Sequence, residues 1–245
     1  MKICFLAAGK SSRIYKKINK PKCLIKINQN TLIVNLIKNT KNLNINKKYI
    51  VLGFQKKKII QHLSNLKNIN FIINKKYNSH DMLHSIMLFL KKNADDDVII
   101  SYSDVYYDKS VLSKLIQLKN KNITLPILCN WKKIWNFRKK KIEDDGETLK
   151  INRGGYLTEI GEKIYNKKIN YQFMGIILIP KIKIKSVLDA YKKIKSKKMQ
   201  TTKFLNLLIK RNIKIRTIKY KKFWFEFDDF EDIKGFNNIK KKIKL

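Results

Sequence analysis

Short apolar segments alternate with longer amphipathic segments along the first half of the chain. Each apolar segment has the length of a strand buried on both faces, and the segments between them carry apolar residues at helical spacing. We expect strands at residues 3–7, 49–53, 71–74, 98–101 and 123–128, and helices at residues 31–39, 56–66, 82–90 and 110–118. This alternation predicts an α/β fold in which a doubly wound, mostly parallel sheet is covered by helices on both faces.

The pattern changes after Asn130. The segment that follows is polar and carries the turn signals Gly146 and Arg153-Gly154-Gly155, so we interpret residues 130–170 as a small hairpin-bearing insertion. The alternation then resumes with a strand at 173–179, helices at 184–194 and 203–210, a strand at 213–220 and a terminal helix. Because no linker or internal repeat interrupts the chain, we expect residues 1–245 to form a single domain.

The chain is strongly basic. It contains 56 Lys and Arg residues and 18 Asp and Glu residues, which gives a net charge of +38. Such a balance suggests a nucleic-acid or anionic-membrane partner. However, only five of these residues are Arg, and Lys, Asn, Ile and Tyr, which AT-rich codons encode, are all abundant. We therefore attribute the surplus to codon bias and expect no specific nucleic-acid partner, although the positive field would still attract anionic substrates.

Cysteine usage and hydropathy bear on the compartment. The three cysteines, Cys4, Cys23 and Cys129, are far apart and odd in number, which argues against both a disulfide framework and a zinc site. The apolar run at residues 3–8 is shorter than the about 7–15 residues of a secretory signal, and no run approaches the about 20 residues of a membrane span. We expect a cytoplasmic protein that does not insert into a membrane.

The first candidate for chemistry is a loop of small residues directly after the first predicted strand. It comprises Leu6, Ala7, Ala8, Gly9, Lys10, Ser11, Ser12 and Arg13. Backbone N–H groups of such a loop can hold phosphate oxygens, and Arg13 can add charge. By itself such a loop is more often an ordinary tight strand-to-helix connection.

A second candidate follows closely, at Pro21-Lys22. Pro21 stiffens the backbone beside Lys22, which could neutralise a phosphate. In a chain so rich in lysine, this residue carries little information alone.

Together, the loop, Arg13 and Pro21-Lys22 resemble the signature of the nucleotidyltransferase superfamily, which includes the sugar-phosphate nucleotidyltransferases. The family pattern has Gly where this chain has Ser11. The resemblance continues in Ser101 to Asp104, which is similar to the family's acidic metal-binding turn, and in residues 224–232, which are similar to its C-terminal acidic segment.

The resemblance implies a Rossmann-like nucleotidyltransferase fold and a Mg²⁺ ion held by Asp104 and Asp228, with Glu226 as a possible third ligand. It implies that Arg13 and Lys22 act by neutralising charge on a nucleoside triphosphate. For a single acid at a strand end, a helix cap or a solvated loop is the alternative interpretation.

Four further segments, at residues 130–138, 145–149, 159–163 and 171–175, are similar in order to the phosphocholine cytidylyltransferase-like subgroup. Members of that subgroup use CTP with phosphocholine, aminoalkyl phosphonates or phosphoglutamine. The resemblance implies an acceptor site next to the insertion, formed by Trp131, Trp135, Glu147, Lys163 and Gln172. Trp131 and Trp135 lie one helical turn apart and could enclose a quaternary ammonium group, or could simply pack inside the insertion.

Residues 80–85 are similar in style to the subgroup's segment beside the nucleobase, which implies nucleotide contacts for Asp81 and Ser85. His80, Asp81 and Tyr171 depart from the usual residues of the subgroup.

We therefore expect an enzyme that joins CMP from CTP, or the nucleotide of another triphosphate, to a small phosphorylated or phosphonate acceptor and releases pyrophosphate. Its product would serve the decoration of a surface polysaccharide or lipid. A sugar-1-phosphate nucleotidyltransferase is the alternative enzyme. A basic nucleic-acid-binding protein and an inactive interaction subunit are alternatives of other classes, and the intact Arg13, Lys22, Asp104 and Asp228 argue against the last. The oligomeric state stays open.

Overall fold

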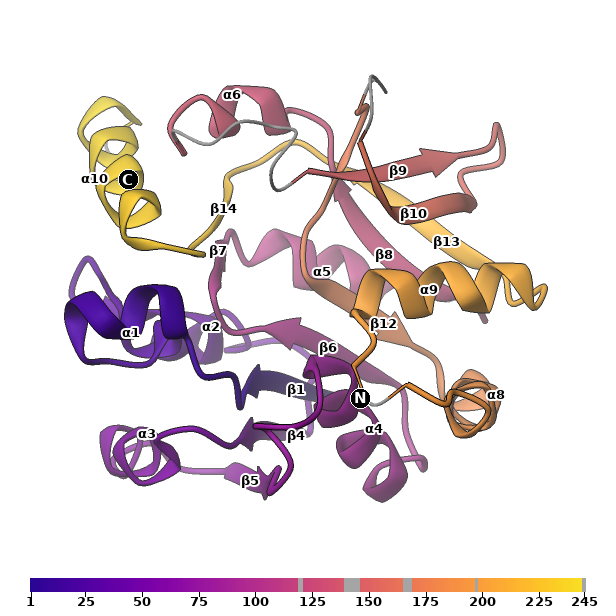
Figure 1. Ribbon diagram of the computed structural model, residues 1–245, viewed down its shortest axis with the longest axis horizontal. Helices are drawn as coiled ribbons and strands as arrows, with labels where there is room; N and C mark the ends of the chain where they lie inside the picture. Colours follow the sequence, from indigo (N-terminus) through magenta and orange to yellow (C-terminus); the bar gives the residue numbers. More distant parts are fainter. Residues whose placement is uncertain (119–120, 139–145, 165–168, 197, 244–245) are drawn as a thin grey trace.

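A computed structural model describes residues 1–118, 121–138, 146–164, 169–196 and 198–243 of the chain, built around an eight-stranded mixed sheet (Figure 1). Seven strands follow the order β11 (Gln172–Phe173), β8 (Ile123–Leu128), β12 (Ile176–Ile179), β6 (Val98–Tyr102), β1 (Lys2–Ala7), β4 (Lys47–Leu52) and β5 (Ile69–Ile73). The eighth strand, β13 (Ile215–Tyr220), pairs with β8.

The predicted doubly wound, mostly parallel sheet is confirmed. Strand β1 lies between β4 and β6 and is parallel to both, β4 is parallel to β5, and β13 is parallel to β8. Strands β11 and β12 run antiparallel to their neighbours. Because the parallel strands β1, β4 and β6 end at the same edge of the sheet, the loops that follow them lie close together.

Side chains of β1 alternate between two apolar cores, one on each face of the sheet. Ile3 and Phe5 belong to the first core, and Cys4 and Leu6 belong to the second. The first core also contains residues from α1 (Ser12–Ile18), α2 (Leu32–Lys38), α3 (Lys56–His62), α5 (Ser110–Gln117), α6 (Trp131–Trp135) and α10 (Phe230–Ile243). The second contains residues from α4 (Met82–Lys92), α8 (Lys181–Lys192) and α9 (Thr201–Lys210). Helices therefore cover both faces, as Figure 1 shows.

Within the described residues, three two-stranded sheets accompany the main one. Strands β2 (Lys26–Ile27) and β3 (Asn30–Thr31) form a short hairpin, and β7 (Val105–Tyr107) pairs antiparallel with β14 (Trp224–Glu226). The hairpin expected in the insertion is present as β9 (Glu147–Ile151) and β10 (Leu157–Lys163), and β10 packs against α9. Residues 139–145 and 165–168 of the predicted insertion lie outside the described residues.

The structure differs from the expected pattern at several places, among them the β2–β3 hairpin, where the sequence predicts no strand. Helix α1 and the β7–β14 pair were not predicted, because these elements are short and their apolar residues show no clear period. The expected strand at 173–179 is divided into β11 and β12 by Gly175, whose φ is 70°. The carbonyl of Gly175 accepts a hydrogen bond from the backbone N–H of Tyr102 at 2.8 Å, so the break fixes the end of β6.

Among the described helices, none combines the length and the apolar character needed to cross a membrane.

Gly175 and Gly155 allow a matched test of the break in the strand. Both have positive φ, but a Cβ at Gly175 would lie 2.9 Å from the Tyr102 ring, whereas one at Gly155 would meet nothing within 4 Å. We expect Gly155→Ala to lower the free energy of unfolding by about 1 kcal/mol through backbone strain, and Gly175→Ala by about 2–4 kcal/mol because steric overlap is added. Urea unfolding measures both changes, and equal losses would contradict the proposed role of Tyr102 packing.

Candidate active site

The loop after β1 holds its shape through Ser11. This residue has a φ of 55°, in the left-handed region that glycine adopts most easily. Its Oγ accepts a hydrogen bond from the backbone N–H of Lys22 at 3.1 Å. The serine that replaces the family's glycine therefore adopts the glycine-like conformation and joins the loop to the Pro21-Lys22 segment.

The loop and this segment enclose a cavity of about 200 Å³. It is lined by Leu6, Ala7, Gly9, Ser11, Ser12, Arg13, Pro21, Lys22, Cys23, Met82, Ser103 and Asp104. Two residues expected in the loop site have other positions. Ala8 is buried and its carbonyl accepts a hydrogen bond from the Phe54 N–H, while Lys10 is exposed and does not line the cavity.

Lys22 lies between the two predicted metal-binding acids. Its Nζ is 3.1 Å from Asp104 Oδ2 and 3.0 Å from Asp228 Oδ1. Burial by itself would lower the pKa of Lys22, but the two carboxylates more than offset this and raise the pKa above its ordinary value. Lys22 is therefore a fixed cation at physiological pH.

The β7–β14 pair explains why these acids, distant in sequence, are neighbours. Asp104 follows β6 and precedes β7, and Asp228 follows β14. The backbone N–H of Phe227 donates to the carbonyl of Asp104 at 2.9 Å, and the Ser103 hydroxyl donates to the carbonyl of Leu6 at 2.6 Å. The two acidic turns are thus fastened to each other and to the end of β1.

A buried arginine stands behind Asp228. Arg138, 1% exposed, donates from Nη2 to Asp228 Oδ2 at 2.8 Å and from Nε to Asp232 Oδ1 at 2.9 Å. Glu226 Oε2 lies 3.6 Å from its Nη1. Breaking a buried ion pair by removing one partner costs about 3–5 kcal/mol, so this cluster constrains the local fold strongly.

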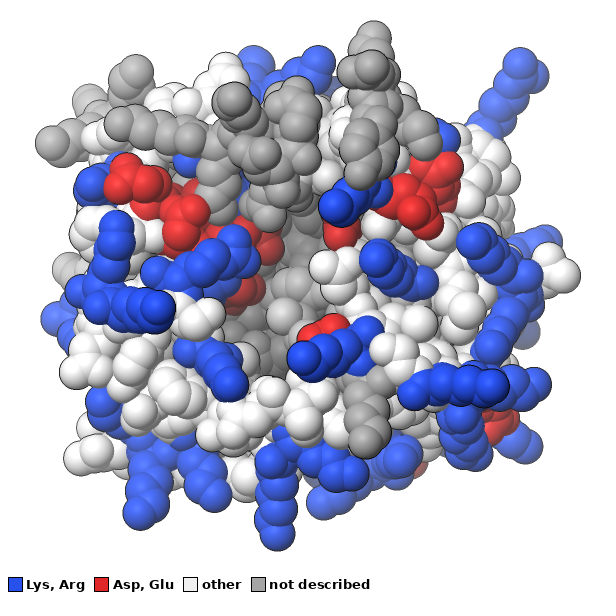
Figure 2. Space-filling model, viewed as in Figure 1, with Lys and Arg blue, Asp and Glu red and all other residues white. Residues whose placement is uncertain are grey.

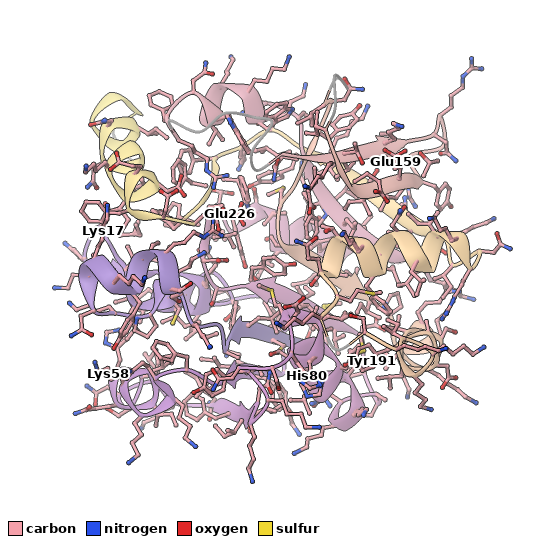
Figure 3. The ribbon with its side chains drawn as sticks, in the orientation of Figure 1. Lys17, Lys58, His80, Glu159, Tyr191 and Glu226 are labelled. Carbon is pink, nitrogen blue, oxygen red and sulfur yellow. The ribbon has the colours of Figure 1, made fainter. Side chains whose placement is uncertain are left out.

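Glu226 was expected as a possible third metal ligand. Figure 3 shows it between α10 and the central sheet, whereas Glu159 lies away from it on the hairpin. Burial, and then the charge of Asp228, raise the pKa of Glu226 well above its usual range, while Arg138 opposes the shift. Within the described part of the chain, no three His, Cys, Asp or Glu side chains are arranged as a ready metal centre, so the site offers a cation two carboxylates, Asp104 and Asp228.

One carboxylate oxygen of Asp104 is suited to bind a metal ion. Asp104 Oδ1 is buried and has no hydrogen-bond partner among the described residues. A buried carboxylate oxygen without a partner is costly, and a hard cation would satisfy it.

A larger cavity of about 520 Å³ adjoins the first, and Arg13 and Met82 line both. Its walls include Asp81, Tyr102, Glu147, Thr148, Gln172, Phe173, Gly175, Gln200, Thr201, Thr202, Glu226 and Asp228. Asp81, predicted to contact the nucleotide, thus lines the same cavity as Glu147 and Gln172, which were predicted to contact the acceptor. Glu147 Oε1 accepts a hydrogen bond from the Thr202 hydroxyl at 3.1 Å, which orients the carboxylate.

Of the two alternatives for Trp131 and Trp135, an aromatic cage and packing inside the protein, the structure supports packing. Trp131 and Trp135 are 3% and 5% exposed, belong to the apolar core and do not line the larger cavity. Their rings meet edge to face, and the guanidinium of Arg138 lies 4.9 Å from the centre of the Trp135 ring. Packing occupies these rings, so they present no open face to a ligand.

The aromatic wall of the cavity comes instead from Tyr102 and Phe173, whose ring centres are 5.9 Å apart and nearly perpendicular. Burial raises the pKa of the Tyr102 phenol, so it stays neutral beside the nearby carboxylates. Sequence reasoning missed Tyr102, although its place two residues before Asp104 was an available signal.

Two other expected contacts do not face the cavities. Lys163, at the end of β10, is exposed and lines neither of them. Ser85 is buried on α4, where its hydroxyl accepts a hydrogen bond from Asn74 Nδ2 at 3.0 Å. Ser85 therefore packs within the fold, and Lys163 lies outside both cavities.

Charge distinguishes the larger cavity from the rest of the molecule. Asp81, Glu147, Glu226 and Asp228 line it, against Arg13. Figure 2 shows acidic side chains on both sides of a central hollow, with lysine and arginine side chains projecting around it. A protein with a net charge of +38 thus lines its larger cavity with more carboxyl side chains than basic ones.

Comparison with known proteins agrees with this geometry. The family model for the MobA-like NTP transferase domain matches residues 3–131. The CTP:phosphoglutamine cytidylyltransferase of Campylobacter jejuni is 28% identical over 251 residues, which cover 95% of this chain and 98% of that protein.

Solved structures share the fold. A structure assigned as a glucose-1-phosphate thymidylyltransferase from Bacillus anthracis has a TM-score of 0.79 and 16% identity, over 100% of this chain and 97% of the other. The CTP:phosphocholine cytidylyltransferase of Streptococcus pneumoniae has a TM-score of 0.74 and 18% identity, over 97% and 98%. The inositol-1-phosphate CTP transferase of T. maritima has a TM-score of 0.75 and 15% identity, over 98% and 96%.

Arg13 and Lys10 provide a matched test of the loop site. The Arg13 side chain lines both cavities and places Nη2 3.8 Å from Asp228 Oδ1, whereas Lys10 lines neither. We expect Arg13→Ala to weaken binding of a nucleoside triphosphate by about tenfold or more, because a charge-assisted contact is lost, and Lys10→Ala to change it by less than about threefold. Isothermal titration calorimetry measures both. Equal effects would show that the loop alignment is wrong.

Proposed function

The chain belongs to the MobA-like NTP transferase family, and on this premise we propose that it transfers CMP from CTP to a small, amine-bearing phosphorylated acceptor. The observation that carries the proposal is the pair of adjoining cavities: one is formed by the loop and Lys22, the other is acidic, and Arg13 lines both. The name of the 28% identical relative, a CTP:phosphoglutamine cytidylyltransferase, supports both the nucleotide and the acceptor class.

In the proposed reaction the triphosphate lies against the loop and the acceptor occupies the larger cavity. An oxygen of the acceptor phosphate attacks the α-phosphorus of CTP and forms a new P–O bond. The bond from the α-phosphorus to the bridging oxygen breaks, and pyrophosphate leaves with that electron pair. The acceptor phosphate is already an anionic nucleophile, so the residues contribute positioning and charge, with Lys22 and Arg13 facing the phosphates.

The acidic cavity favours an acceptor with a positive group. Glu147 is oriented by Thr202, and Tyr102 and Phe173 supply ring surfaces in the same cavity. Carboxylates and aromatic faces both attract ammonium groups. Glu147 begins β9 and Gln172 begins β11, so we propose that the hairpin-bearing insertion forms the acceptor side of one domain, residues 1–245.

We propose Mg²⁺ as the cofactor, held by Asp104 and Asp228 together with phosphate oxygens of the substrate. Mg²⁺ is commonly bound through one or two carboxylates plus phosphates, and the unpartnered Asp104 Oδ1 supports this assignment. When bound, the ion neutralises charge that develops on the transferring and leaving phosphates. Asp104 and Asp228 also hold Lys22, which keeps its ammonium beside the same phosphates.

The CMP-activated product would suit a later transferase that decorates a surface polysaccharide or lipid.

The metal assignment predicts that EDTA abolishes turnover and that Mg²⁺ restores it. We expect Asp104→Asn or Asp228→Asn to lower kcat by about a hundredfold or more, because each removes a hard oxygen ligand. The matched control is Asp189→Asn, which changes a partly exposed acid of α8 paired with Lys192. Pyrophosphate release measures the rates, and near-normal turnover in both folded active-site variants would overturn the assignment.

The substrate assignment predicts that CTP is used better than ATP, GTP or UTP, and that phosphoglutamine, phosphocholine or aminoethylphosphonate is used better than sugar 1-phosphates. We expect Glu147→Gln to raise the KM for the amine-bearing acceptor by about tenfold, since one charged contact is lost, with little change in the KM for CTP. A screen of pyrophosphate release over these pairs tests both statements. If sugar 1-phosphates are used best and Glu147→Gln has no effect, a sugar nucleotidyltransferase replaces this proposal.

A further inference from the structure

We infer that Arg138 is a positioning residue that fixes the orientation of Asp228 for nucleotidyl transfer. This inference rests on the proposed function, in which Asp228 faces the substrate phosphates and their metal ion. Arg138 ends a segment, residues 130–138, that is similar to the cytidylyltransferase-like subgroup, and the structure places it behind the acidic turn, 1% exposed and away from the cavity walls.

Arg138 holds one oxygen of Asp228 and leaves the other facing the site. Its Nη2 donates to Asp228 Oδ2 at 2.8 Å, while Asp228 Oδ1 faces Lys22 Nζ at 3.0 Å. A carboxylate gripped on one oxygen by a buried guanidinium cannot rotate freely about its terminal bond. The arginine therefore selects which oxygen of Asp228 meets the substrate side.

Asp232 holds both the arginine and the acidic turn. Its Oδ1 accepts from Arg138 Nε at 2.9 Å, and its Oδ2 accepts from the backbone N–H groups of Asp228 at 2.7 Å and Asp229 at 3.1 Å. The backbone and the side chain of Asp228 are consequently fastened to one buried unit. This arrangement fits the support that precise catalytic geometry requires.

Arg138 reaches this position because the backbone of the preceding residue packs closely against α10. The chain leaves α6 with the N–H of Arg138 donating to the Trp135 carbonyl at 2.8 Å. A Cβ on Gly235 of α10 would overlap the Phe137 carbonyl oxygen, so only glycine permits this contact. The guanidinium also lies 4.9 Å from the Trp135 ring centre. The contact between α10 and the segment after α6 thus fixes the position of the Arg138 side chain.

A merely structural ion cluster would behave differently from a positioning residue. Loss of a structural cluster lowers stability but leaves the kcat of the folded enzyme unchanged. Loss of a positioning residue lowers kcat with little change in the KM for the nucleotide, and its effect disappears once Asp228 itself is removed.

The test uses the full chain with Arg138→Lys, which keeps the charge but loses the fork, and Arg138→Gln. The matched control is Arg211→Gln, because Arg211 donates to the carbonyl of Ala190 far from the site. Steady-state assays of pyrophosphate release from CTP give kcat and KM, and thermal unfolding shows whether each variant is folded. We expect kcat to fall by about tenfold or more in Arg138→Lys and about a hundredfold in Arg138→Gln, with the KM for CTP within about threefold of wild type.

Two further measurements keep the inference open to refutation if Arg138→Gln folds poorly. Gly235→Ala should displace the arginine without changing any charge and should lower kcat as Arg138→Lys does. Binding of Mn²⁺ by paramagnetic resonance, without turnover, should weaken by about fivefold or more in Arg138→Lys and stay unchanged in Arg211→Gln, because a mobile Asp228 must be ordered by the ion.

A double variant completes the test. Arg138→Lys combined with Asp228→Asn should be no slower than Asp228→Asn alone, since the arginine acts through that carboxylate. Multiplying losses, or an unchanged kcat and Mn²⁺ affinity in folded Arg138→Lys, would overturn the inference. Failure of the proposed function is distinguishable, because wild type and Arg211→Gln would then release no pyrophosphate, while Mn²⁺ binding would still test the position of Asp228.

Discussion

The buried ion cluster around Asp228 is the constraint on which the rest of the site depends. Charges taken out of water are tolerated only when they are paired closely, and here the pairs join segments from very different parts of the chain. Lys22 comes from the start of the domain, Asp104 from the end of β6, Arg138 from the insertion and Asp232 from α10. The cluster cannot form until all four segments have docked, so correct assembly of the fold and assembly of the reactive site are the same event.

The sequence predicts most of the scaffold because burial leaves a clear pattern in it. Strands β1, β4, β6 and β8 are apolar on both faces, and the helices between them have apolar stripes, so periodicity finds them. The β7–β14 pair shows no such pattern, because its partners are set by contacts between distant segments. The motifs identified Lys22, Asp104 and Asp228, and the structure brings these three side chains together.

Spacing alone could not assign the environments of the other residues. The separation of Trp131 and Trp135 correctly places both on one helical face, but nothing in it tells whether that face meets a cavity or the core. Arg138 is similarly ambiguous, because an arginine in a basic stretch is normally solvated. Its burial follows from Gly235, whose missing side chain admits the Phe137 carbonyl from almost a hundred residues earlier in the chain. A relation of this kind becomes visible only in three dimensions.

Ser11 has a consequence for the thermodynamics of nucleotide capture. A glycine at this place would let the phosphate loop sample many backbone shapes, and each arriving triphosphate would have to select one of them. The Ser11 hydroxyl, bonded to the Lys22 N–H, confines the loop when the chain folds, so the ordering entropy is lost once per molecule and not once per turnover. Nucleotide association at this loop should accordingly carry a smaller entropic penalty than at a glycine loop of the same shape. The free energy of association should therefore change less with temperature.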